Sequence, residues 1–339
     1  MKRIDGEGGG GQVLRLAVSF AALENTSITV ENVRGGRENP GLRAQHVAAI
    51  ESITALTDGE SDGVRVGSET VTFEPGDSIG GETAVDVGTA GSIPLVFDAV
   101  LPLAMAAESP ILLHATGGTD VKWAPPIDFL RTVKFPVLER FGLEATIEQV
   151  SRGFYPQGGG SATLKLVPVS INSIDCVDRG GLEAISIHSV ATDDLSSAEV
   201  TTRQIDGVKR TLNGDVSVPI SDHRDVVESP STGTVVLVVA QYERSRAGFS
   251  ALGEPGWPAE EVGAAAASAF LTFHDTRAAV ERHLADQLLP FLARSGGTIT
   301  TPKRTAHIRS SISLLSAFDH PLDVHRSSRG IRIESTQST

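Results

Sequence analysis

The chain has 339 residues, 40% of them hydrophobic, which is enough to bury a large core and to form two domains. Acidic residues outnumber basic ones by 42 to 29, and the net charge is −13. No apolar run approaches the roughly 20 residues that span a bilayer, and a single cysteine, Cys176, excludes an internal disulfide and a cysteine-rich metal cluster.

The positive charge is carried mainly by arginine, because lysine is nearly absent. An acidic, lysine-poor composition fits a cytoplasm kept at high salt, where self-repulsion is screened, and we expect a halophilic host. An ordinary acidic enzyme with a pI of 5.1 is the alternative. The N-terminal MKRIDGEGGGG lacks the apolar segment of a signal peptide, so we expect a cytoplasmic protein.

Three segments share a glycine-rich or polar start that leads into a long apolar helix, at residues 8–23, 88–106 and 283–293. Further helices are predicted at residues 43–56 and 126–141. Strands are predicted from β-branched runs at residues 27–33, 70–73, 111–116, 162–167 and 298–300. This alternation predicts an α/β protein built of layered units that repeat along the chain.

The region between residues 178 and 274 has a different pattern. Strand-like runs at 184–191 and 234–242 surround a predicted helix at 198–212, and residues 259–273 predict a last helix. We therefore expect three parts. These are a large domain with repeats one and two (1–177), an inserted small α/β domain (178–274) and the third repeat of the large domain (275–339).

Two segments in the first repeat have the chemistry of phosphate binding. EGGGGQVLR (residues 7–15) is a glycine-rich loop entering a helix, where backbone N–H groups can approach an anion. RGGRENPGLRAQH (34–46) clusters Arg34, Arg37 and Arg43 with Gln45 and His46, and guanidinium groups match phosphate oxygens. A structural turn and a solvated charged loop are the alternatives.

His307 is the candidate nucleophile. It stands near the end of the β-rich run TITTPKRTAHI, so we expect it at a strand end, beside the polar start of the helix HLADQLLPFLA. A neutral imidazole can attack a phosphoryl group and pass that group onward. A satisfied core histidine is the alternative. Two further segments, residues 117–130 and 153–160, read as proline- and glycine-rich turns or as substrate contacts.

In combination these segments resemble the RNA 3′-terminal phosphate cyclase family, in its archaeal, halophilic, catalytic type. The resemblance covers most of the chain and is carried by motifs in the family's order: EGGGGQVLR, RGGRENPGLRAQH, GTAGS, GGTDVKWAPP, GFYPQGGG and HLADQ, followed by the distal His307. It implies three repeats like the C-terminal domain of translation initiation factor three, with a small domain inserted before the last repeat.

The resemblance also implies a reaction. Such enzymes use ATP and a divalent metal, Mg or Mn, and act on RNA 3′-phosphate ends. The histidine that matches His307 attacks the α-phosphate of ATP and keeps AMP. AMP then moves to the RNA 3′-phosphate to form RNA-pp-A, and the neighbouring 2′-hydroxyl expels AMP to close a 2′,3′-cyclic phosphodiester.

Roles for individual residues follow from the same match. Arg34, Arg37, Arg43, Gln45 and His46 would face phosphates of ATP or RNA. Glu7 would bind the metal. The nucleotide would be bound by Gln12, Asp98, Pro125 (or Pro126 beside it) near the adenine, His283, Leu284, Ala285, Asp286 and Gln287.

The chain departs from the family pattern at several positions. Aligning from Gln12 puts Gly8 at the place of the family's metal-associated glutamate, with Glu7 one position away. Asp98 replaces a common glutamine, and His283 replaces the aromatic residue that often opens the ADQ motif. Ser310 and Ser311 follow His307 where threonine and asparagine are usual.

Two other function classes compete with the cyclase. A non-catalytic, cyclase-like RNA-binding factor in ribosome assembly would lack the nucleophilic histidine, so His307 together with HLADQ favours the enzyme. A transferase of the enolpyruvyl class has a related repeat architecture, but it needs a different set of basic residues and no histidine adduct.

Overall fold

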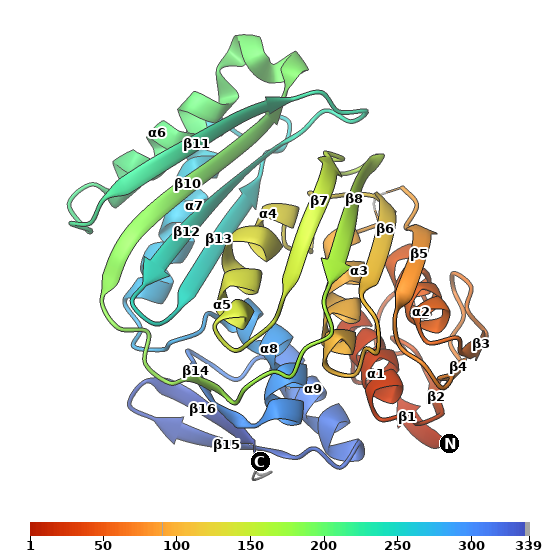
Figure 1. Ribbon diagram of the computed structural model, residues 1–339. Helices are drawn as coiled ribbons and strands as arrows, with labels where there is room; N and C mark the ends of the chain where they lie inside the picture. Colours follow the sequence, from red (N-terminus) through yellow and green to blue (C-terminus); the bar gives the residue numbers. More distant parts are fainter. Residues whose placement is uncertain (90, 336–339) are drawn as a thin grey trace.

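The computed structural model describes residues 1–89 and 91–335, so Ala90 of the GTAGS motif and residues 336–339 lie outside it. The described residues form an α/β protein with four four-stranded sheets (Figure 1). Three of these sheets belong to units with one topology, βαβαββ, and in each the strand order is first, second, fourth, third. The first two strands of each unit pair in parallel, which requires the helical crossover between them.

The first unit is N-terminal and contains a glycine-rich entry into its first helix. Its elements are β1 (Lys2–Asp5), α1 (Gly11–Leu23), β2 (Ile28–Glu31), α2 (Ala44–Leu56), β3 (Glu60–Asp62) and β4 (Val71–Glu74).

The second unit has its helices broken by prolines. Its elements are β5 (Gly81–Asp86), α3 (Ile93–Val100), β6 (Ile111–Gly117), α4 (Ile127–Phe129), α5 (Phe135–Glu139), β7 (Ala145–Ser151) and β8 (Gly160–Leu166). A 3₁₀ turn, Leu101–Met105, follows α3, and a π-helical turn, Leu130–Lys134, joins α4 to α5. The side chain of Ser92 starts α3 by accepting a hydrogen bond from the N–H of Leu95 (3.3 Å).

The third unit is split in sequence. Its elements are β9 (Ile174–Cys176), α8 (Arg282–Ser295), β14 (Gly297–Thr301), α9 (Ala306–Ala317), β15 (Leu322–Ser327) and β16 (Gly330–Ser335). β9 pairs with β14, so the third unit begins before the inserted segment. The sequence analysis had predicted that it begins at residue 275.

The inserted segment forms the fourth sheet, in the order β11-β10-β12-β13. Its elements are β10 (Leu182–Thr192), α6 (Val200–Leu212), β11 (Ile220–Val227), β12 (Thr234–Tyr242), β13 (Arg246–Leu252) and α7 (Ala259–His274). Helices α6 and α7 lie together on one face of this sheet (Figure 1). Their close approach requires a glycine at position 207, because a Cβ at Gly207 would lie 2.1 Å from the carbonyl oxygen of Glu260.

One hydrophobic core joins the three repeated units. The helices α1, α3, α8 and α9 gather between the sheets (Figure 1), and α1 contacts both α3 and α9. Small residues of α1, among them Ala17 and Ala21, are 0% exposed and allow this close helix packing. No helix among the described residues has the length and apolar character needed to cross a membrane. The likeness of the three units to the initiation factor domain stays a prediction.

A buried ion-pair network ties the loop after β6 to the end of β7. The guanidinium of Arg152 lies 3.1 Å from Oδ2 of Asp120 and 2.5 Å from Oδ2 of Asp128. Asp120 is 0% exposed, so its charge depends on this partner.

We expect Arg152→Met to lower the free energy of unfolding by about 3–5 kcal/mol, because the buried carboxylate of Asp120 loses its ion-pair partner and Asp128 is left with Arg131 (3.4 Å). Chemical denaturation measures the change. The matched control is Arg332→Met, which breaks the exposed pair with Glu334 (2.7 Å) and should cost less than about 1 kcal/mol. Equal effects of the two substitutions would contradict the assigned role of the network.

Candidate active site

A cleft of about 1540 Å³ lies where the three units and the inserted domain meet. It is lined by the starts of α1, α2, α8 and α9, by the loop after β6 and by parts of β13 and α7. Most of the predicted site residues line it: Gln12, Arg34, Arg37, Arg43, Gln45, His46, Asp98, Pro125, His283, Asp286, Gln287 and His307. Segments far apart in sequence therefore contribute to one hollow.

His307 lies in the first turn of α9, so its predicted place on a strand end is wrong. Strand β14 ends at Thr301, and the side chain of Thr305 caps α9 by accepting a hydrogen bond from the N–H of Ile308 (3.1 Å). Pro302 and this N-cap residue were the sequence signals for a new helix.

The imidazole of His307 is accessible and faces a carboxylate. Its Nδ1 lies 3.6 Å from Oδ2 of Asp286 in α8, and the two side chains are 49% and 14% exposed. Because α8 and α9 both begin beside the cleft, the positive ends of their helix dipoles favour phosphate oxygens there.

Glu281, which the sequence analysis did not single out, caps α8. Its carboxylate accepts hydrogen bonds from the N–H of His283 (2.8 Å) and from the N–H of Leu284. The carboxyl group is 3% exposed, and burial raises its pKa to about 7. A glutamate just before a helix that begins with polar residues was the available signal.

Leu284 and Ala285, predicted to bind the nucleotide, lie in the hydrophobic core. Both are 0% exposed, and the N–H groups of both bond to Glu281, so neither residue has a group to offer a ligand. They position α8. His283, on the exposed side, accepts a hydrogen bond from Nε of Arg282 (3.0 Å) at Nε2, and burial and Arg282 lower the pKa of its imidazole.

Gln287 and Asp98 both line the cleft but differ in whether their side-chain oxygens have a partner. Oε1 of Gln287 is buried and has no hydrogen-bond partner within residues 1–89 and 91–335. Asp98 forms an ion pair with Nζ of Lys134, which is 0% exposed. The aspartate that replaces the family's glutamine therefore stabilises a buried lysine, and this partner was not recognised in the sequence.

The arginine-rich segment is partly engaged in its own loop. The guanidinium of Arg34 donates to the carbonyl groups of Asn39 (3.0 Å) and Gly41 (2.9 Å), and that of Arg43 donates to Asn39 (3.0 Å). Burial, Arg43 and Arg37 lower the pKa of Arg34. This concentration of positive charge favours an anion in the cleft.

His46 is buried and acts on the backbone. Its Nδ1 accepts the N–H of Arg43 (3.0 Å) at the start of α2. Burial, together with Arg15, lowers the pKa of His46 to about 3, so the ring is neutral. A Cβ at Gly11 would lie 1.9 Å from its Nε2, which is why glycine is needed at this turn of the glycine-rich loop.

Arg15 is a further candidate that the sequence analysis did not name as a site residue. It is 9% exposed and lines the cleft, and among the described residues no carboxylate lies within ion-pair distance of its guanidinium. Burial lowers its pKa, and the more distant Asp98 and Asp286 partly offset this effect. It lies one helical turn after Gly11, a spacing that could have revealed it.

Glu7, the predicted metal ligand, does not reach the cleft. It is exposed, and its N–H bonds to Oδ1 of Asp5 (3.0 Å). In the described part of the chain no group of three or more His, Cys, Asp or Glu side chains can hold a metal ion.

Gln12, predicted to bind the nucleotide, lines the cleft. Its Nε2 donates a hydrogen bond to Oγ of Ser310 (3.2 Å) and so links α1 to α9. Pro126 is buried, and Pro125 faces the cleft.

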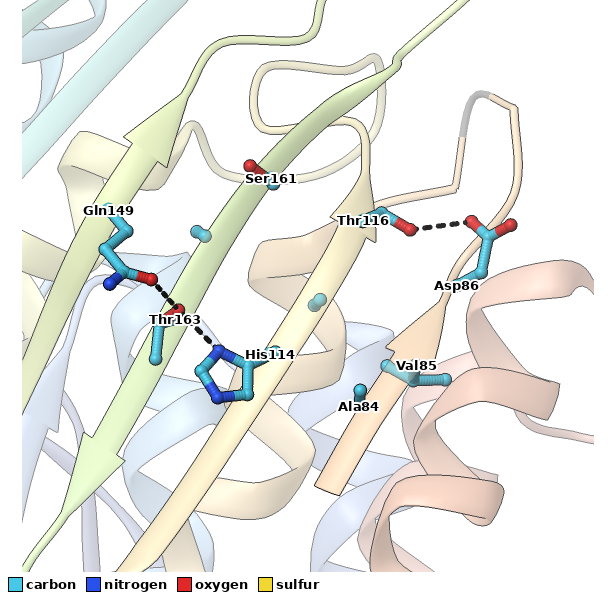
Figure 2. Close-up of a pocket in the computed structure, with 10 residues that line it drawn as sticks. Ala84, Val85, Asp86, His114, Thr116, Gln149, Ser161 and Thr163 are labelled. Carbon is cyan, nitrogen blue, oxygen red and sulfur yellow. Dashed lines mark hydrogen bonds between the residues drawn. The ribbon is translucent and has the colours of Figure 1, made fainter. Parts of the chain in front are cut away.

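A second hollow, of about 460 Å³, lies on the outer face of the β5-β6-β8-β7 sheet (Figure 2). Its polar groups bond to one another: His114 Nδ1 to Thr163 Oγ1 (2.9 Å), Thr163 to Gln149 (3.2 Å) and Thr116 to Asp86 (3.0 Å). It contains none of the predicted site residues, so the large cleft is the candidate active site.

The raised pKa of Glu281 predicts a pH-dependent stability. The folded state holds this proton up to about pH 7, whereas the unfolded carboxyl loses it near 4.5, so the free energy of unfolding falls as pH rises from about 4.5 to 7. The contribution is on the order of 3 kcal/mol. Glu281→Gln should therefore gain stability relative to the parent between pH 5 and 8, measured by denaturation at each pH. A constant difference would contradict the burial argument.

Comparison with known proteins gives a consistent result. The family model for RNA 3′-terminal phosphate cyclase matches residues 6–320. An RNA 3′-terminal phosphate cyclase of Halobacterium salinarum is 43% identical, over 97% of this chain and 98% of its own. Those of Pyrococcus furiosus and Archaeoglobus fulgidus are 39% and 35% identical, over 91% and 94% of this chain and 90% and 95% of theirs. The chain therefore belongs to the RNA 3′-terminal phosphate cyclase family.

Proposed function

We propose that this protein converts an RNA 3′-terminal phosphate to a 2′,3′-cyclic phosphodiester at the expense of ATP, through AMP bound covalently to His307. The observation that carries the proposal is the accessible imidazole of His307, 3.6 Å from Asp286, in the cleft that Arg15 also lines. A nucleophile and an anion-binding cation thus share one hollow.

Asp286 orients the nucleophile. A proton on Nδ1 of His307 would point toward this carboxylate, which leaves the lone pair of Nε2 for attack. Nε2 attacks the α-phosphorus of ATP, the bond to the bridging oxygen breaks, and pyrophosphate leaves. The carboxylate also stabilises the positive charge that forms on the imidazole.

The second and third steps move AMP onward. An oxygen of the RNA 3′-phosphate attacks the phosphorus on Nε2, which gives RNA-pp-A and frees His307. The 2′-hydroxyl then attacks the RNA phosphorus and expels AMP, so the cyclic ester forms. The ring closure is intramolecular, because the hydroxyl is on the adjacent ribose carbon.

The cleft offers groups that fit ATP. Gln287, Pro125 and His283 line the cleft, so an amide, a proline ring and an imidazole are available to contact the base. Arg15 and Arg37 line the cleft, where their guanidinium groups could bind phosphate oxygens. Asp98 remains paired with Lys134 and would contribute through this pair.

A divalent metal, Mg or Mn, would neutralise triphosphate charge and take most of its ligands from phosphates and water, as Mg²⁺ commonly does. The described residues form no group of three metal-binding side chains. Glu7 lies outside the cleft, so Asp286, which lines it, is better placed than Glu7 to contact the metal. We further propose a cytoplasmic protein of a halophilic host, in agreement with the net charge of −13.

The central test is formation of a protein–AMP adduct. Incubation with ATP labelled at the α-phosphate, in high salt with Mg or Mn, should label the parent protein through an acid-labile, alkali-stable bond. His307→Ala should abolish the label, and Asp286→Asn should slow labelling roughly tenfold to a hundredfold by misorienting the ring.

The matched control is His325→Ala, since His325 is an exposed histidine that pairs with Glu334 (3.4 Å) outside the cleft and should leave labelling intact. Labelling that persists in His307→Ala would place the nucleophile elsewhere. No labelling in any form, with retained RNA binding, would favour the non-catalytic RNA-binding factor in ribosome assembly.

The role of Arg15 gives a separate prediction. Arg15→Met should raise KM for ATP or for the RNA 3′-phosphate about tenfold or more, because a charge-assisted phosphate contact is lost. It should not lower the free energy of unfolding, since no partner carboxylate is left unpaired. Arg294→Met, which breaks an exposed pair with Glu24 (3.6 Å) away from the cleft, is the control. A large loss of stability with unchanged KM would show a structural role.

A further inference from the structure

An exposed indole stands in the loop after β6 and lines the same cleft as His307. Trp123 is 88% exposed, more than any other large hydrophobic side chain described. Its ring lies 5.9 Å from that of Tyr155 at 81°, and Nζ of Lys122 lies 5.2 Å from the Tyr155 ring centre. Burying a large aromatic side chain is favourable, so an indole that the fold leaves in water marks a surface on which a ligand can bury it.

The two loops that present these rings are firmly joined. The N–H of Thr119 donates to the carbonyl of Gly153 (2.8 Å), and the N–H of Tyr155 donates to the carbonyl of Asp120 (3.2 Å). The buried ion pair between Asp120 and Arg152 also links the two loops. The rings are therefore presented by a preorganised base, and a ligand would meet a surface that needs little ordering.

The chemistry of this surface matches a single-stranded nucleic acid. Aromatic rings stack on the faces of unpaired bases, and nearby cations follow the backbone. Lys122 supplies a cation beside the rings, although it also pairs with Glu254 of the inserted domain (3.0 Å). Arg37 and Arg43 line the same cleft. An RNA strand whose 3′-phosphate reaches His307 must continue outward, and the exposed indole of Trp123 lines the cleft that contains His307.

We propose that Trp123 and Tyr155, with Lys122, form a stacking platform for a base upstream of the terminal nucleotide of the RNA substrate. This inference rests on the proposed function and specifies how the same site holds its strand. The platform would secure the strand while the terminal phosphate reacts, and would be tolerant of sequence because every base has a stacking face.

Tryptophan fluorescence tests the proposal, because the chain has two tryptophans. In Trp257→Phe, Trp123 is the sole emitter. A short single-stranded RNA with a 3′-phosphate, added without ATP, should quench this emission. The same RNA with abasic residues upstream of its last nucleotide, a nucleoside 3′-phosphate alone, or ATP alone should quench it far less. Trp123→Phe, in which Trp257 alone emits, is the matched control and should show no quenching.

Kinetics supply the second measurement. Trp123→Ala should raise KM for the intact oligonucleotide about tenfold, and Trp123→Phe should restore most of the loss. On the abasic oligonucleotide, Trp123→Ala and the parent should have the same KM. Because Trp123 is exposed, its replacement leaves no cavity in the core.

The outcomes separate the platform from the proposed function. Quenching by ATP instead of RNA, equal quenching by intact and abasic RNA, or no quenching by an RNA whose binding is shown by fluorescence anisotropy would each overturn the platform. RNA that fails to bind at any salt concentration would overturn it as well. Formation of the protein–AMP adduct by Trp257→Phe is scored independently, so loss of that adduct refutes the cyclase mechanism and leaves the quenching result interpretable.

Discussion

The site depends on one constraint, which is that the starts of α1, α2, α8 and α9 converge on a single cleft. Convergence is possible because the apolar remainder of these helices is buried in a shared core. Small residues such as Ala17 and Ala21 let α1 approach both α3 and α9. The positive ends of four helix dipoles then face the same volume, which favours phosphate oxygens there.

The side chains extend this preference in a protein that is otherwise strongly acidic. Arg15 is buried without an ion-pair partner among the described residues, and Arg37 and Arg43 add charge at the same hollow. Asp286 contributes a negative charge to the cleft and faces His307. A net charge of −13 repels nucleic acid at long range, so recognition of RNA would depend on these local cations.

The sequence predicted much of the local structure for physical reasons. The helices predicted at residues 43–56 and 259–273 and the strands predicted from β-branched runs at 111–116 and 234–242 are all present in the structure. Helix α9 was missed because TITTPKRTAHI is rich in β-branched residues. In the folded chain the cap by Thr305 outweighs that local preference, so His307 sits in a helix.

The amino-acid sequence by itself determined which chemistry the chain carries: a candidate histidine nucleophile, arginine clusters, glycine turns and a run of motifs in a recognisable order. Only the tertiary structure decided which of these residues share a cleft. It placed Leu284 and Ala285 in the core and Glu7 outside, and it revealed Glu281, Lys134 and Arg15. The physical reason is that periodicity is local, whereas burial and side-chain hydrogen bonds join residues hundreds of positions apart, as Gln12 and Ser310 show.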